Sequence, residues 1–95
     1  MKIALKTAPY DSADYLKTPE DVAAYLEAAF EDGDAALITH ALGVVARAEG
    51  MTEVAKQAGL TRASLYKALS ADGRPEFATV LKVVQALGLK MTIAA

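Results

Sequence analysis

The chain has 95 residues, enough for one domain with one hydrophobic core, and its 54% hydrophobic content is too high for a disordered protein. It contains no Cys, which excludes a disulfide framework and a thiolate metal site, and no apolar run approaches the roughly 20 residues of a membrane span. Because the first residues lack the apolar stretch of a signal peptide, we expect a single cytoplasmic domain over residues 1–95.

The net charge of −2 is distributed unevenly along the chain. Residues 1–40 carry three Lys and eight acids, a net charge of −5, whereas residues 41–95 carry seven bases and four acids, a net charge of +3. This separation predicts two surfaces with two different partners, one basic and one polyanionic, although acids also cluster on any short solvated helix.

Turn and cap residues divide the first half of the chain into an arm and two helices. Residues 1–17 are expected to form an extended or irregular N-terminal arm. The first helix begins after Thr18, whose hydroxyl can cap free backbone N–H groups, and it ends at Gly33. The second helix runs from Asp34 to Glu49. Apolar residues at helical spacing predict the buried faces, which comprise Val22, Leu26, Ala29, Phe30, Ile38, Ala41, Leu42 and Val45.

Three shorter helices and a strand are predicted in the second half. Two helices, at about 51–58 and 62–69, are separated by a turn, and Pro75 is placed to start a fifth helix that ends at Gly88. The apolar face of this fifth helix is predicted to be Phe77, Val80, Leu81, Val84 and Leu87. Residues 89–94 alternate apolar and polar side chains, which predicts a strand that pairs either with 3–6 or with a second chain. The predicted fold is all-α, with five helices and a short C-terminal strand.

The segment 51–70 has the pattern of a helix-turn-helix. Gly59 permits the positive φ of a tight turn, and Ala55 is small enough for two helices to approach closely. An apolar set is expected to fix the crossing angle, and it comprises Val54, Ala58, Leu60, Leu65 and Ala68. With these residues inside, the second helix must present Arg62, Ala63, Ser64 and Lys67 to the outside, which is typical of a helix that enters the major groove of DNA.

The outward residues have the chemistry of base readout. Arg62 can donate a bidentate pair to guanine O6 and N7, and Lys67 can reach guanine or a phosphate. Ser64 can bond to several base edges, and the Ala63 methyl group can contact a thymine methyl group. The remaining predicted contacts position the protein on phosphates and are Thr52, Tyr66 and Arg74, together with Thr61, which is chiefly the N-cap of the second helix.

Nothing in the sequence has the pattern of an active site, so we expect a protein that is not an enzyme and uses no metal or cofactor. The single His40 lies in a predicted helix among apolar residues, which favours a structural or surface role. Glu27, Glu31 and Asp34 could pair as carboxylates, but without a His or Cys partner or a phosphate-binding loop they are expected to form a solvated face.

A family resemblance covers nearly the whole chain. It rests on five stretches, which are 10–16 (YDSADYL), 41–48 (ALGVVARA), 50–51 (GM), 58–69 (AGLTRASLYKAL) and 75–81 (PEFATVL). The segment 51–70 resembles helix-turn-helix domains of the lambda-repressor type. The full string resembles the addiction-module antidote proteins, the HigA-like antitoxins of bacterial type II toxin–antitoxin pairs.

The resemblance implies a homodimer that represses its own operon through double-stranded operator DNA. It also implies that the protein binds and neutralises a small basic toxin similar to the ribosome-dependent RNA-cleaving family. The family's toxin contacts cannot be transferred residue by residue, so we place this contact on the acidic half, where aromatic and apolar side chains stand beside acids. The predicted toxin-binding residues are Tyr10, Asp11, Asp14, Tyr15 and Leu16.

Two other functions use the same sequence features. A stand-alone repressor without a toxin would share every DNA-reading residue, and it is distinguished by whether a small basic protein is encoded next to it. A protein-interaction module whose helix-turn-helix no longer touches DNA is distinguished by a gel shift against the protein's own upstream region.

Overall fold

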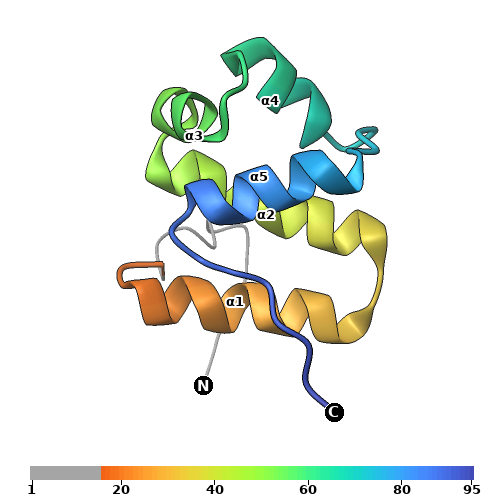
Figure 1. The fold of residues 1–95 in the computed structure, drawn as a ribbon. Coiled ribbons are helices and arrows are strands. Elements are labelled where there is room, and N and C mark those ends of the chain that lie inside the picture. The colour runs from red at the N-terminus through yellow and green to blue at the C-terminus, as the bar shows by residue number, and fades with distance from the viewer. Residues whose placement is uncertain (1–15) are drawn as a thin grey trace, which may run out of the picture.

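The computed structural model describes residues 16–95, and all regular secondary structure in this range is helical (Figure 1). Five helices follow one another, α1 (Pro19–Asp32), α2 (Ala35–Glu49), α3 (Met51–Ala58), α4 (Arg62–Ala68) and α5 (Phe77–Ala86). The prediction of an all-helical protein with five helices is confirmed for this range. Most of the predicted arm 1–17 lies outside the described residues. Leu16, at its end, is half-buried and packs against the core.

Local capping sets the boundaries of the first two helices. At the start of α1, the backbone N–H of Asp21 donates to the Thr18 hydroxyl at 3.1 Å, and the Thr18 N–H donates to the Asp21 carboxylate at 3.2 Å. Gly33 ends the helix in the left-handed conformation, with φ of 77°. The carboxylate of Asp34 then accepts the Ala36 N–H at 2.9 Å and begins α2. These boundaries are the ones that the cap residues predict.

All five helices contribute to one hydrophobic core. Four side chains are almost completely enclosed, Leu42 and Val45 from α2, Leu65 from α4 and Val83 from α5. The other buried apolar residues around them are Val22, Leu26, Ala29, Ala41, Ala46, Met51, Val54, Ala55, Leu69 and Val84. The α3–α4 pair is therefore held by side chains of helices distant in the sequence, and its orientation is part of the fold.

The start of α5 differs from the prediction. Pro75 was expected to start the helix, but the helix begins at Phe77, and Glu76 precedes it in an extended conformation with φ of −65° and ψ of 154°. Because Glu76 is not helical, Pro75 belongs to the loop that leads from α4 into α5.

The buried face of α5 is also different from the predicted one. Phe77, expected in the core, is 68% exposed, whereas Val83, which was not on the predicted face, is fully buried. Val84 is buried as expected, and Val80, Leu81 and Leu87 are only half-buried. Apolar residues occur on several sides of this helix, so its spacing alone did not determine which side packs against α3.

The predicted strand at 89–94 is not confirmed, because these residues have no regular secondary structure. Gly88 ends α5 with φ of 80°, and the Leu89 N–H returns to the Val84 carbonyl at 3.2 Å. The tail then runs across α1 (Figure 1). The physical reason is that a strand needs a ladder, and no second strand exists in 16–95. The predicted partner segment 3–6 lies outside the described residues.

Across residues 16–95, no helix combines the length and the apolar character that crossing a membrane requires.

Candidate nucleic-acid interface

The turn between α3 and α4 is short because Gly59 adopts the left-handed conformation. Its φ is 73°, a value that L side chains rarely adopt. The Gly59 N–H donates to the Lys56 carbonyl at 3.2 Å, and the Leu60 N–H donates to the Ala55 carbonyl at 2.8 Å. In Figure 1, α3 is seen nearly along its axis while α4 lies across the view, so the two helices cross steeply. Ala55 is buried, as expected for a small residue where two helices meet.

Burial fixes which side of α4 faces outward. Leu65 is completely buried, and Leu69, just after the helix, is buried as well. Leu60 and Ala68 were predicted to help fix the crossing angle, but they are only half-buried. The rest of the α4 surface is an exposed arc, which carries the residues that the sequence placed outside, Arg62, Ala63, Ser64 and Lys67, and also Tyr66.

Two of these exposed side chains form a pair along the helix. The Arg62 guanidinium lies 5.3 Å from the centroid of the Tyr66 ring, and its Nη2 donates to the Tyr66 hydroxyl at 3.3 Å. Residues four apart on a helix are neighbours, and a guanidinium over an aromatic face is attracted by the ring quadrupole. The pair therefore holds a planar, five-donor group on the outer surface of α4.

The first turn of α4 is organised by Thr61. Its hydroxyl oxygen accepts the Ser64 N–H at 3.0 Å, and the hydroxyl lies 2.8 Å from the Ser64 hydroxyl. Thr61 is the N-cap, as predicted. The two hydroxyl groups, already hydrogen-bonded to each other, lie beside Arg62 at the exposed N-terminus of the helix.

The other predicted phosphate contacts lie on neighbouring segments. Thr52 is exposed in the first turn of α3, and Arg74 is exposed in the loop after α4. The exposed acids of α1 lie at the far end of the molecule, since α1 and α4 stand on opposite sides of α2 and α5 (Figure 1). These acids are Glu20, Asp21, Glu27, Glu31 and Asp32. An anion that approached α4 would therefore meet few of the carboxylates of residues 16–40.

Two features of this region were not found from the sequence. The Arg62–Tyr66 pair had a signal, the i, i+4 spacing of an Arg and an aromatic residue on one helix. The special role of Gly73 had no signal in the sequence, because its pattern predicted only an ordinary loop. A Cβ at Gly73 would lie 2.8 Å from the Lys67 carbonyl oxygen and still closer to the Ala68 carbonyl oxygen. Only glycine allows the loop to pass this close to the last turn of α4.

The remaining candidate residues form no second site among the described residues. His40 is exposed on α2, and Glu27, Glu31 and Asp34 are exposed as well. No group of three or more His, Cys, Asp or Glu side chains within 16–95 could hold a metal ion. Of the predicted toxin-binding residues, Tyr10, Asp11, Asp14 and Tyr15 lie outside the described residues.

Fold and surface together define a small helical protein in which a short helix, set across its neighbour, presents polar and basic side chains. The chain belongs to the family described as probable addiction module antidote protein, whose model matches residues 6–95. A relative in Haemophilus influenzae, described as an uncharacterized protein, is 43% identical over 84 residues, which cover 88% of this chain and 87% of that relative. No solved structure matches. Membership of an antidote family implies a toxin as partner.

Proposed function

We propose that this protein is an antitoxin that binds operator DNA through the helix-turn-helix α3–turn–α4, represses its own operon in the cytoplasm, and neutralises a small basic toxin. The observation that carries the DNA-binding part is the exposed arc of α4. It combines Arg62, Ser64 and Lys67, all exposed, on a helix that the buried Leu65 anchors to the core. A helix that is anchored by its inner face and polar on its outer face can enter the major groove of DNA without rearrangement of the fold.

Each side chain on this surface has a role that its chemistry supports. Arg62 reads guanine, Ser64 and Ala63 contact base edges, and Lys67 reaches guanine or a phosphate. Thr52, Thr61, Tyr66 and Arg74 position the protein on the backbone. The pairing of Arg62 with Tyr66 supports this assignment, because a side chain that is already ordered loses less conformational entropy on binding.

A single α4 contacts few base pairs, so we propose that the protein binds as a homodimer on a palindromic operator. The centres of the half-sites are then about 10 base pairs apart, or a multiple of that spacing. Sedimentation at high protein concentration tests this proposal, which a strictly monomeric profile contradicts.

The toxin contact is proposed to include the acidic arm, with Tyr15 and Leu16 as apolar anchors beside Asp11 and Asp14. The combined substitution of Tyr15→Ala with Asp14→Lys is expected to impair toxin capture and to leave operator binding intact. Copurification with the product of the adjacent reading frame, together with a gel shift, measures both activities. Loss of both activities would assign these residues to the fold instead.

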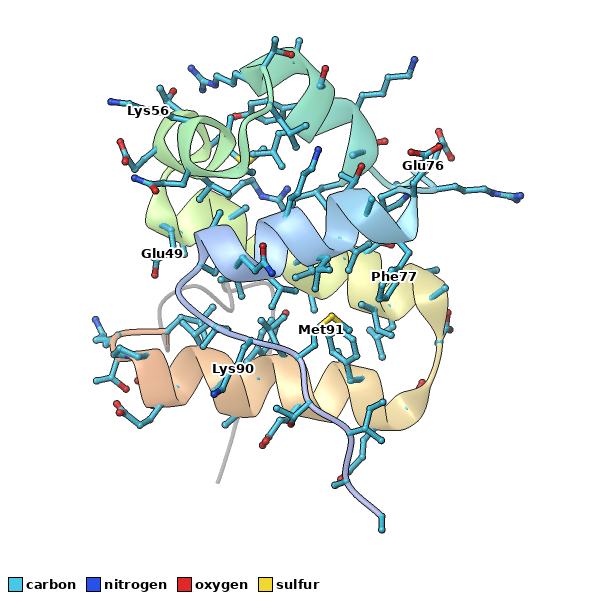
Figure 2. The ribbon with its side chains drawn as sticks, in the orientation of Figure 1. Glu49, Lys56, Glu76, Phe77, Lys90 and Met91 are labelled. Carbon is cyan, nitrogen blue, oxygen red and sulfur yellow. The ribbon has the colours of Figure 1, made fainter. Side chains whose placement is uncertain are left out.

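The decisive experiment measures the affinity for the gene's own upstream DNA at fixed salt. Arg62→Ala is expected to weaken specific binding by about 1–3 kcal/mol, the usual contribution of a good bidentate base contact. Lys56→Ala is the matched control, because it removes the same charge from a side chain of α3 that projects away from α4 (Figure 2). If both variants bind the operator as the wild type does, the assignment of α4 is wrong. If both are weakened equally, Arg62 contributes only charge.

A further inference from the structure

A groove opens beside the loop that follows α4, and Arg74 of this loop is one of its lining residues. Its volume is about 880 Å³. One wall is the junction of α1 and α2, with Phe30 and Ile38, and the other is the loop after α4 and the start of α5, with Phe77 and Val80. Met91 of the C-terminal tail lines the groove as well.

The groove exposes large apolar side chains to solvent. Phe77 is 68% exposed and Met91 is 37% exposed. Both lie on the same face of the molecule, whereas Lys90 projects away from Met91 over α1 (Figure 2). A Phe side chain left largely in water forgoes the stabilisation that its burial would contribute. An exposed apolar patch with a hollowed shape is typical of an interaction site.

The charges around the groove indicate which partner fits. Of the charged residues, Asp72 and Arg74 line the groove and offset each other, whereas Glu31, Asp32 and Asp34 are exposed beside the lining residues Phe30 and Ala35. The surroundings of the groove are therefore net negative, even with Lys90 included. Apart from Arg74, which is proposed to contact DNA, these charges repel DNA phosphates, and two copies meeting through this face would bring like charges together. A positively charged protein is attracted, and it arrives faster because of the complementary potential.

We propose that this groove is a docking site for a positively charged protein partner that inserts an apolar side chain between Phe77 and Met91. This proposal rests on the proposed function, in which the positively charged partner is the toxin. The groove would then be a second toxin contact, separate from the acidic arm, on residues of α1, α2, α5 and the tail. The occupant is anchored by Phe77 and oriented by the acids at the rim.

The experiment measures the affinity of the full-length protein for the purified product of the adjacent reading frame. Phe77→Ser is expected to weaken binding about tenfold or more, as truncation of a central aromatic anchor does. Its matched control is Ile93→Ser, because Ile93 is a fully exposed apolar residue of the C-terminal tail that does not line the groove. Asp72→Lys reverses a charge at the groove and is expected to weaken binding at low salt, an effect that shrinks as salt is added.

Glu49→Lys is the charge-matched control for Asp72→Lys, because Glu49 lies at the opposite end of α2 from the groove (Figure 2). If the wild type does not bind the adjacent product, the proposed toxin partner is wrong. If the wild type binds and both groove variants bind as tightly, the groove assignment is wrong while the proposed function stands. A groove variant that lowers the oligomeric state but leaves partner affinity unchanged assigns the groove to self-association and also overturns the proposal. Should Phe77→Ser lose helicity, Asp72→Lys decides the question alone.

Discussion

Substitution of Gly73 by Ala should damage both stability and DNA binding, because this glycine lies against the last turn of α4. Gly73 is not one of the glycines with positive φ, so left-handed strain is not the reason. The obstacle is space. An added Cβ would lie 2.8 Å from both the Lys67 carbonyl oxygen and the Ala68 carbonyl carbon, closer than real Cβ atoms approach. All of these neighbours are backbone atoms, so no side-chain rotation relieves the clash.

The loss of stability follows from the backbone segments that must shift to relieve the clash. Either the loop that contains Gly73 or the C-terminal end of α4 must shift, and the Gly73 N–H, which donates to the Ser70 carbonyl at 2.8 Å, moves with it. Overpacking of this kind typically costs about 1–3 kcal/mol. Ala also lowers the conformational entropy of the unfolded chain, which stabilises the folded protein by only about 0.4–1 kcal/mol. We expect Gly73→Ala to lower the free energy of unfolding by about 1–2 kcal/mol, and the Tm by about 4–16 °C.

Chemical denaturation and a gel shift at a temperature well below the Tm measure the two effects. Gly33→Ala is the matched control, since Gly33 has φ of 77° but no atom within 4 Å of an added Cβ. It should cost a similar roughly 1–2 kcal/mol through left-handed strain, yet leave operator affinity unchanged because it lies far from α4. A Gly73→Ala protein with the stability and operator affinity of the wild type would refute the argument that this close approach positions α4.

Further predictions concern α4 and the loop that follows it. Thr61→Ala removes the N-cap and the partner of the Ser64 hydroxyl, so stability should fall by about 0.5–2 kcal/mol in a denaturation curve. Leu65→Ala empties a completely buried position and should cost about 2–5 kcal/mol in the same measurement, whereas a loss below 1 kcal/mol would mean that the core collapses around it. Arg74→Ala should weaken specific and non-specific DNA binding alike and should reduce the slope of log affinity against log salt by about 1. A selective loss at the operator would instead assign Arg74 to base contacts.

Most helix boundaries were determined by the sequence, because caps act within a few residues. Thr18 and Asp34 cap the free N–H groups of α1 and α2, and Gly33 and Gly59 supply the left-handed residues that end α1 and α3. The outward side of α4 was also predictable. Once Leu65 was assigned to the core, the helical repeat placed Ala63 and Lys67 on the opposite side of the helix.

The face of α5, the fate of the tail and the groove were decided by the tertiary structure. Apolar residues occur on several sides of α5, and only its packing against α3 selected Val83 and left Phe77 exposed. The alternation in 89–94 satisfied the pattern of a strand, but a strand exists only where another supplies hydrogen bonds, and 16–95 contains none. The close approach at Gly73 depends on the path of a loop past α4. Burial, pairing and steric contact are properties of residues distant in the sequence, so they are fixed only when the helices have packed.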